Sequence, residues 1–352
     1  MPLPGATPVG GYEACNRRTV EALRANGARV EELHYPQPVG GPAAKLKGYW
    51  AGFAALLRRI PRQQGAILHI TGLYKQFAVA ELLLLRKARR HGVKTVYDIR
   101  AGSMYRHYAR LGPAYRWLFR RLLRSADLIM IEGMEYAPFV LQVTGRAAFY
   151  LPNHISAAGL PARAAAAGAD APLRLIYVGR VNLEKGVETA LQAARLLGQR
   201  GVAAELAIAG PGEEQLMARL RADYADVNVA WLGSLPSQQV LAEFGRSHFF
   251  LFPTRHTGEG HSNALTEAMA MGCVPLASEN GFNRSVVGPA GEILALDAGA
   301  AEYADALLRR WRDGGWDATS RAAMLRTKEL FSSEQAVARL QGAYLNLLKA
   351  TT

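Results

Sequence analysis

Residues 249–272 read FFLFPTRHTGEGHSNALTEAMAMG: an apolar run, a glycine-containing turn and a helical segment in succession. Phe249–Phe252 predict a buried strand, and Ser262 or Asn263 is expected to cap the helix that follows. Gly258 and Gly260 would let the backbone come close to a ligand. A strand that passes through such a turn into a helix is the unit from which parallel α/β sheets are built.

The same alternation extends along most of the chain. Helical segments, for example 187–199, 213–224 and 237–246, separate short apolar runs. The predicted strands are 65–70, 93–98, 127–131 and 148–151 in the first half, and 173–178, 204–209, 227–232, 249–252 and 274–277 in the second. This pattern predicts an α/β fold of two Rossmann-like, doubly wound domains that face each other across a cleft.

The alanine-rich stretch 157–170 predicts a linker between the two domains. We therefore expect an N-terminal domain over residues 1–152 and a C-terminal domain over 153–330. Only a few residues precede the turn at Gly10 and Gly11, where such a domain usually opens with a strand. The first strand is therefore expected to be short, missing or non-standard.

Composition narrows the class of protein. A chain of 352 residues that is 50% hydrophobic and 20% charged is too long for one ordinary core and too apolar to be disordered. It shows no uniformly apolar stretch long enough to cross a membrane and no signal peptide. Cys15 and Cys273 cannot form a disulfide framework, and no cysteine–histidine cluster suggests zinc. A cytoplasmic protein is expected.

Positive charge is concentrated in the first half. Lysine and arginine number 42 against 29 acidic residues, a net charge of +13. Residues 1–150 contain 23 basic and 9 acidic residues, so they carry the whole excess. This asymmetry indicates an anionic partner for one domain: a phospholipid surface, a nucleic acid or a substrate that carries a pyrophosphate.

Two glutamates flank the helix start in the opening motif. Glu259 lies in the glycine turn, and Glu267 lies about one turn inside the helix. Both could face the carboxyl edge of the sheet, where open α/β sheets bind ligands, and the helix N-terminus favours an anion or sugar hydroxyls. The alternative is a capped helix with two solvated glutamates.

A second turn, VGRVNLEKG at 178–186, places Arg180 at a strand end and Lys185 before a helix. Two cations there suit a diphosphate leaving group, although a surface pair near a loop is the simpler reading. A third turn, AGPGEE at 209–214, is weak evidence for a binding site by itself, but it follows the next predicted strand of the same sheet. Because no DxD motif is evident, we expect no metal ion and no other cofactor to be required.

The ordered set VGRVNLEKG, AGPGEE, WLGSLP (231–236) and FPTRHTGEGHSNALTEAMAMGCVPLAS (252–278) resembles retaining GT-B glycosyltransferases of family 4. The resemblance is strong over about residues 170–345 and looser over 1–150. It implies a GT-B fold and a nucleotide-sugar donor held mainly by the C-terminal domain. It also implies that residues 331–352 form a final helix that crosses back onto the N-terminal domain.

The resemblance assigns roles to residues of the matching motifs. Arg180 and Lys185 would bind the donor diphosphate, Glu267 the ribose hydroxyls, and Glu259 with nearby backbone amides the transferred sugar. The donor-binding set it implies is Gly10, Gly11, Gly179, Arg180, Lys185, Gly210, Gly212, Gly260, His261, Ser262, Asn263, Ala264 and Glu267. It further implies transfer to a saccharide or lipid-linked acceptor, with retention, in bacterial polysaccharide or glycolipid assembly.

The N-terminal half departs from the family. Many relatives place a histidine just after the strand that corresponds to 93–97, where this chain has Asp98 and Arg100. Either is expected to act as the catalytic group that contacts sugar or acceptor, and His69 is a further candidate. A histidine at a strand end is more often structural, so the structural alternative stays open.

Two segments combine aromatic and basic residues. In 113–124, Tyr115, Leu118, Phe119 and Leu122 share one helix face, and Arg116, Arg120 and Arg124 share another. Residues 45–59 combine Tyr49, Trp50, Phe53 and Leu57 with Lys45, Lys47, Arg58 and Arg59. They predict either core-facing stripes with solvated arginines or peripheral attachment to the inner face of the cell membrane.

Other classes of protein fit less well. The chain shows no nucleic-acid-binding motif, so no nucleic-acid partner is expected. An epimerase-like GT-B enzyme and a catalytically inactive scaffold remain as alternatives. A phosphorylase would need a lysine site for pyridoxal phosphate, and no convincing motif for one is present.

Overall fold

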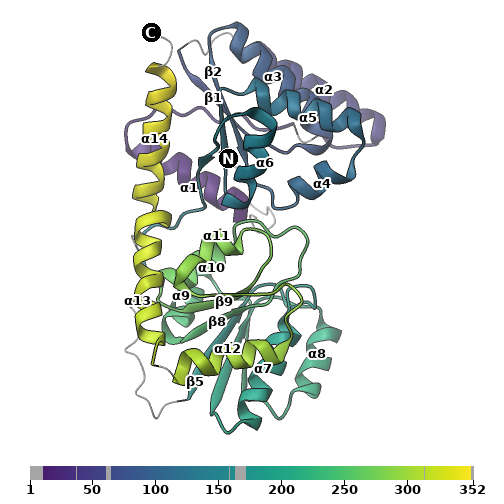
Figure 1. Ribbon diagram of the computed structural model, residues 1–352. Helices are drawn as coiled ribbons and strands as arrows, with labels where there is room; N and C mark the ends of the chain where they lie inside the picture. Colours follow the sequence, from purple (N-terminus) through teal and green to yellow (C-terminus); the bar gives the residue numbers. More distant parts are fainter. Residues whose placement is uncertain are drawn as a thin grey trace. The chain divides into compact units, whose positions relative to one another are not determined.

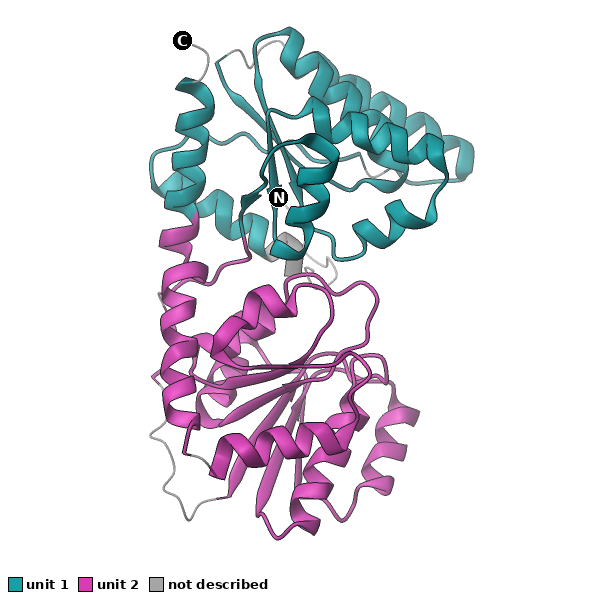
Figure 2. Cartoon of the chain, viewed as in Figure 1, with its two compact units in different colours: residues 1–151, 337–352 teal, residues 152–336 magenta. Residues whose placement is uncertain are grey.

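Two parallel sheets form the framework of the structure (Figure 1). The computed structural model describes residues 11–36, 38–60, 65–157, 159–162, 172–312 and 314–349. The chain divides into unit 1, residues 1–151 and 337–352, and unit 2, residues 152–336 (Figure 2). The boundaries expected from the sequence fall after residue 152 and at residue 331.

Unit 1 contains a four-stranded parallel sheet in the order β1-β2-β3-β4. Each of the four predicted strands is present within a few residues of its expected bounds. The strands are β1 (Ile67–Thr71), β2 (Lys94–Ile99), β3 (Leu128–Ile131) and β4 (Phe149–Tyr150). The helices are α1 (Gly11–Ala25), α2 (Pro42–Arg59), η2 (Lys75–Phe77), α3 (Ala78–Arg90), α4 (Met104–Arg110), α5 (Pro113–Ser125), η3 (Met134–Tyr136) and α6 (Ala137–Thr144).

Local sequence explains where these helices begin and end. Both α2 and α5 start with proline directly after an extended glycine, Gly41 or Gly112, and proline suits the first helical turn because no partner is lost there. Gly145 ends α6 at φ 69°, a left-handed conformation that glycine adopts without steric cost. Among the described residues no strand precedes α1, and Gly10 lies outside them.

One face of the unit 1 sheet packs against the first and last helices. Val96 and Met130 of the sheet are buried with Leu23 of α1, and with Val337 and Leu340 of α14 (Ser333–Lys349). The end of the chain therefore completes the core of unit 1, as the family resemblance implied. No helix among the described residues is long and apolar enough to span a bilayer.

Unit 2 contains a six-stranded parallel sheet in the order β10-β9-β8-β5-β6-β7. The predicted strands are present, and β10 is an additional short strand that sequence analysis missed. The strands are β5 (Leu173–Val178), β6 (Ala204–Ala209), β7 (Val229–Gly233), β8 (Phe249–Phe252), β9 (Val274–Ser278) and β10 (Glu292–Leu294). The helices are α7 (Val187–Gln199), α8 (Glu214–Asp223), α9 (Ser237–Arg246), α10 (Asn263–Ala270), α11 (Asn283–Val287), η4 (Gly288–Ala290), α12 (Ala300–Arg312), α13 (Trp316–Arg326) and η5 (Thr327–Phe331).

The strand order explains where a ligand would bind. The chain runs outward from β5 through β6 to β7, then returns to place β8 on the other side of β5. The fully buried strand β8 and its neighbour β9 contribute Phe249, Leu251, Val274 and Leu276 to the core beneath. The point between β5 and β8 at which the winding reverses is the topological switch point, where open α/β sheets bind ligands.

Candidate active site

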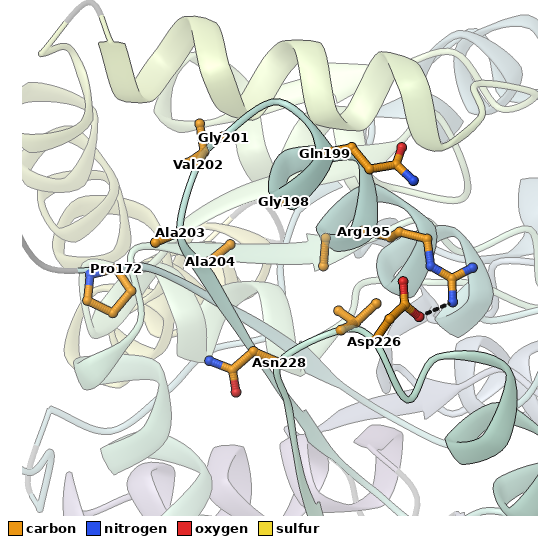
Figure 3. A pocket seen from close by; sticks show the side chains of 12 residues that line it. Pro172, Arg195, Gly198, Gln199, Gly201, Val202, Ala203, Ala204, Asp226 and Asn228 are labelled. Atoms are coloured by element: carbon orange, nitrogen blue, oxygen red, sulfur yellow. Dashed lines mark hydrogen bonds and ion pairs between the residues drawn. The ribbon is translucent and has the colours of Figure 1, made fainter.

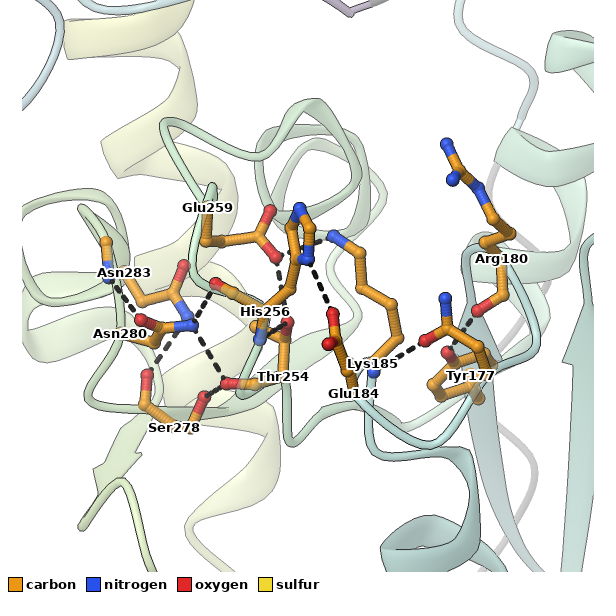
Figure 4. A network of polar contacts seen from close by, with 12 residues as sticks. Tyr177, Arg180, Glu184, Lys185, Thr254, His256, Glu259, Ser278, Asn280 and Asn283 are labelled. Carbon is orange, nitrogen blue, oxygen red and sulfur yellow. Dashed lines mark hydrogen bonds and ion pairs between the residues drawn. The ribbon is translucent and has the colours of Figure 1, made fainter. Parts of the chain in front are cut away.

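The loops that follow β5 and β8 meet at the switch point of the unit 2 sheet. The first contains Arg180 and Lys185, and the second contains Glu259. Arg255 N–H donates to the Glu184 carbonyl at 2.7 Å, which joins the two loops directly. The structure thus brings together the predicted residues Lys185 and Glu259, and the Arg180 side chain lies apart from this pair on the same loop as Lys185 (Figure 4).

Glycines let these loops pack closely. A Cβ on Gly210 would lie 1.8 Å from the Gly179 carbonyl oxygen, and a Cβ on Gly186 would lie 2.2 Å from that of Pro253. Gly210 has φ 149° and Gly186 has φ 79°, so side chains would also be strained there. The β6 loop is bound to the β5 loop because Val181 N–H donates to the Pro211 carbonyl at 2.7 Å. The loop that contains Gly210 and Gly212 therefore lies at the same edge of the unit 2 sheet as the β5 loop.

Lys185 and Glu259 form an ion pair at the centre of the site. The Lys185 Nζ lies 2.6 Å from Glu259 Oε2, which also accepts a hydrogen bond from Thr254 Oγ1 at 2.8 Å. Glu259 is 8% exposed, and the Lys185 side chain is 22% exposed. A buried carboxylate needs such partners, since an isolated one would be strongly destabilised by the loss of water.

Polar residues at the end of β9 and just after it hold the Glu259 loop from the other side. Ser278 Oγ donates to the Thr254 carbonyl at 2.6 Å, and Asn280 Nδ2 donates to the carbonyls of Thr254 and His256 at 3.1 and 2.9 Å. Both side chains are buried. Sequence analysis did not single out these residues, although polar side chains directly after an apolar strand were a signal for them.

Arg180 has a different environment. It is exposed, and its guanidinium forms no ion pair with any residue that the structure describes. Its carbonyl accepts a hydrogen bond from Tyr177 Oη at 2.8 Å, which fixes the backbone beneath it. Burial raises the pKa of Tyr177, and the nearby Glu259 carboxylate raises it further, so this phenol remains a neutral donor. The Arg180 side chain extends away from this anchor (Figure 4) and is available to an anionic ligand.

The start of α10 follows the Glu259 loop. Ser262 is the N-cap residue, as one of the two alternatives expected, but its side chain makes no capping hydrogen bond. His261 is buried, with Nε2 2.7 Å from Thr266 Oγ1 and its ring against Phe331. This places the His261 imidazole in the core, so a ligand contact from His261 would come from its backbone. Glu267 is partly exposed on α10, one turn from the helix start.

The predicted residues of unit 1 form a separate buried network. Arg100 Nε donates to Asp98 Oδ2 at 2.5 Å, and His69 Nε2 lies 3.3 Å from the same oxygen. His69 Nδ1 lies 2.6 Å from Tyr344 Oη, on α14. Burial opposes ionisation of Asp98, but the charge of Arg100 and the contact with His69 outweigh it and lower the pKa of Asp98. The geometry of Asp98 and Arg100 is therefore that of a mutually neutralised pair, and Gly11 opens α1 elsewhere in this unit.

One pocket of unit 2 lies away from the switch point. A pocket of about 550 Å³ lies beside Pro172, Ala203 and Ala204, at the strand starts of β5 and β6, with the Arg195–Asp226 ion pair on its wall (Figure 3). It contains none of the predicted site residues and lies at the edge of the sheet opposite to the switch point. The described residues contain no group of three or more side chains that could hold a metal ion.

Comparison with known proteins shows what the region around the switch point is similar to. Residues 163–324 match the family model described as "Glycosyl transferases group 1". The amylovoran biosynthesis glycosyltransferase AmsK of Erwinia amylovora is 32% identical over 117 residues, which cover 31% of this chain and 28% of AmsK. The putative colanic acid biosynthesis glycosyltransferase WcaL of Salmonella typhimurium is 29% identical over 202 residues, which cover 53% of this chain and 45% of WcaL. The chain thus matches less than half the length of either relative.

Solved structures show the same fold over nearly the whole chain. Sucrose-phosphate synthase from Thermosynechococcus elongatus superposes with a TM-score of 0.70 at 17% identity, covering 97% of this chain and 94% of its own. HepE from Anabaena, solved in complex with UDP, gives a TM-score of 0.70 at 13% identity and covers 96% of both chains. At these identities the likeness establishes the fold alone. The chain therefore has the GT-B fold, and most of its second unit is similar to the group 1 glycosyl transferases.

Proposed function

We propose that this protein is a retaining glycosyltransferase. It would move a sugar from a nucleoside diphosphate sugar to a hydroxyl of a saccharide or lipid-linked acceptor, in bacterial polysaccharide or glycolipid assembly. The observation that carries the proposal is the Lys185–Glu259 ion pair at the switch point of unit 2, with the exposed Arg180 on the same loop as Lys185. The relatives named for amylovoran and colanic acid biosynthesis support the biological setting, and the UDP complex of HepE supports the donor class.

The donor diphosphate would be held by the two cations. As the bond between the sugar C1 and the diphosphate oxygen breaks, negative charge develops on the leaving phosphate. Arg180 and Lys185 would stabilise this charge, a contribution of about 3–4 kcal/mol per well-placed donor by analogy with oxyanion groups. With two cations available, we propose that no metal ion is needed.

Glu259 would act on the transferred sugar. The Lys185 ammonium neutralises the Glu259 carboxylate. A bound diphosphate would compete with this carboxylate for the ammonium. Glu259 would then be free to accept hydrogen bonds from sugar hydroxyls. In a front-face reaction the acceptor hydroxyl attacks C1 on the side from which the diphosphate leaves. Its proton passes to the departing phosphate, and the configuration at C1 is retained.

Replacing Glu259 with glutamine tests this assignment. We expect Glu259→Gln to lower kcat by about 100- to 1,000-fold while donor binding changes little, because the amide keeps the shape but loses the charge at the sugar. The measurement is release of nucleoside diphosphate from the nucleotide sugar whose nucleotide binds. Proton NMR reports the anomeric configuration of the sugar product, and the rate is repeated with EDTA present.

The matched control is Glu279→Gln, an exposed carboxylate of unit 2 that pairs with Arg284. An unchanged rate in Glu259→Gln would remove Glu259 from the reaction. An inverted product would contradict retention, and a rate abolished by EDTA would contradict the metal-free mechanism. Donor binding without any sugar transfer would favour the inactive scaffold, and isomerisation of the free donor would favour an epimerase-like enzyme.

We also propose that unit 1 attaches to the inner face of the cell membrane. The predicted helix 113–124 is α5, and it buries Phe119, Leu122 and Leu123. Its arginines are not simply solvated: Arg120 Nε donates to Tyr108 Oη, and Arg124 Nε donates to the Val143 carbonyl. The exposed apolar side chains of α5 and α2 support the proposal better, namely Trp117, Trp50 and Leu46, which are 62%, 56% and 61% exposed.

The double variant Trp50→Ala/Trp117→Ala tests membrane attachment. We expect at least about a tenfold loss of binding to vesicles that contain anionic phosphatidylglycerol, because each indole would bury apolar area at the interface. Cosedimentation measures the binding, and Leu345→Ala, which removes an exposed leucine of α14, is the control. Absence of vesicle binding by the unaltered protein would contradict the proposal.

A further inference from the structure

The loop that follows β1 in unit 1 is held in a strained conformation. Tyr74 has φ 43° and ψ −134°, and Lys75 has φ 45°. These are the only non-glycine residues with positive φ in the part of the chain that the structure describes. Such conformations cost roughly 1–3 kcal/mol each and persist only where the surroundings enforce them. Two in succession therefore require a specific restraint.

The restraint is the buried carboxylate of Glu81, on α3. Its Oε1 accepts hydrogen bonds from the Leu73 N–H at 2.7 Å and from Tyr35 Oη at 2.9 Å, and its Oε2 accepts one from Tyr97 Oη at 2.7 Å. Glu81 is completely buried, and burial raises its pKa. Gly72 permits the close approach, because a Cβ there would lie 2.3 Å from the Tyr97 ring. The start of the loop is thus tied to the core by a dedicated polar network.

In the restrained loop, the Tyr74 ring is in contact with both a lysine and a histidine. The Lys75 Nζ lies 5.5 Å from the centre of the Tyr74 ring, and the His107 ring centre lies 5.4 Å from it. Tyr74 Oη is 2.9 Å from Ser103 Oγ, and the centre of the Tyr115 ring lies 5.2 Å from that of His107. The aromatic contacts fix the imidazole, while Lys75 is exposed.

No acidic side chain of the described residues forms an ion pair with the lysine or the histidine that contacts Tyr74, which are Lys75 and His107. Burial and the charge of Lys75 together lower the pKa of His107. Two N–H donors, Lys75 in the segment after β1 and His107 on α4 after β2, thus contact the same Tyr74 ring and have no acidic ion-pair partner among the described residues. The segments that follow β1 and β2 leave the carboxyl edge of the unit 1 sheet, the edge where such sheets bind ligands.

We propose that Lys75 and His107 bind an anionic group, a phosphate or a carboxylate, on the acceptor, and that Glu81 positions the loop for this contact. That the group belongs to an acceptor rests on the proposed function. The anion site itself does not, because it follows from the loop geometry and the unbalanced charge. Of the residues involved, Lys75 and His107 touch the ligand, and Glu81 acts only through the loop.

NMR of the His107 imidazole in the full-length protein tests the site without turnover. The probes are methyl phosphate and acetate, each compared with sodium chloride at equal ionic strength. We expect one probe to shift the His107 signal saturably and to raise the His107 pKa, since an anion offsets the charge of Lys75. The probe that binds more tightly distinguishes a phosphate-bearing acceptor from a carboxylate-bearing one.

Variants make the test specific. Lys75→Gln should weaken probe binding at least about tenfold, as expected for the loss of one charged hydrogen bond, and should raise the pKa of His107 in the free protein. Lys47→Gln, at an exposed lysine of α2, is the matched control. Glu81→Gln should retain binding because it keeps an Oε1 acceptor for Leu73 N–H, whereas Glu81→Ala should lose it.

The site is overturned if neither probe shifts the His107 signal beyond the chloride control, or if Lys75→Gln binds as well as the unaltered protein. The first outcome would leave the proposed glycosyltransferase activity intact, because donor binding and transfer are measured separately. Probe binding in a protein without transferase activity would uphold the anion site and contradict the proposed function instead.

Discussion

Lys185→Gln is expected to weaken the binding of a nucleoside diphosphate by about 100-fold. A hydrogen bond to a charged group contributes about 1.5–3 kcal/mol, and 1.4 kcal/mol is a factor of ten in affinity. The variant also leaves Glu259, which is 8% exposed, without its cation. The bare carboxylate would then repel the diphosphate. Calorimetric titration of the variant measures the loss.

A double variant separates these two causes. Lys185→Gln/Glu259→Gln should recover part of the affinity that Lys185→Gln loses, because it removes the unpaired carboxylate. Lys328→Gln, at an exposed lysine in η5, is the control for charge alone. If Lys185→Gln and Arg180→Gln both bind the nucleotide as tightly as the unaltered protein does, the diphosphate lies elsewhere.

The second large effect is expected at Asp98. Asp98→Asn should destabilise unit 1 by about 3–5 kcal/mol, since the variant takes a hydrogen-bonded counterion away from the other charge of a buried ion pair. Arg100 would be that charge, because its side chain is only 2% exposed. Hydrogen exchange of the β2 amides under increasing denaturant measures the stability of this unit by itself. Glu21→Gln, at an exposed residue of α1, is the control.

The same pair predicts how stability changes with pH. The pKa of Asp98 is lowered in the folded protein, so its contribution is complete above the ordinary aspartate pKa and is lost as pH falls through the folded value. The difference in stability between the unaltered protein and Asp98→Asn should therefore shrink in acid. If Asp98→Asn stays fully stable but loses sugar transfer, Asp98 is the catalytic residue that sequence analysis expected, and the structural role is wrong.

Sequence periodicity predicted the elements better than the contacts between them. The bounds of α7, α9 and β8 agree with the prediction because each carries a clear apolar period. The edge strand β10 was missed because three partly buried residues are too few to show a period. The switch point could be located from the order of the loops, but the strand order that creates it is a tertiary property.

The sequence did not predict which side chains pair with one another. Lys185 and Glu259 were each assigned a ligand, yet nothing in two motifs 74 residues apart indicates that they pair with each other. Glu81 begins the run ELLLL, where a helix period gives no sign that the carboxylate points into the core. The left-handed residues Tyr74 and Lys75 also lack the glycine or asparagine that usually announces such a conformation.

The measurement that tests the donor site most directly is calorimetric titration of the unaltered protein with UDP, GDP, ADP and dTDP. We predict that one of the four binds selectively at a single site, and that the heat of binding is lost in Lys185→Gln. That result would also name the base of the donor. Absence of binding by all four nucleotides would contradict a nucleotide-sugar site at the switch point of unit 2.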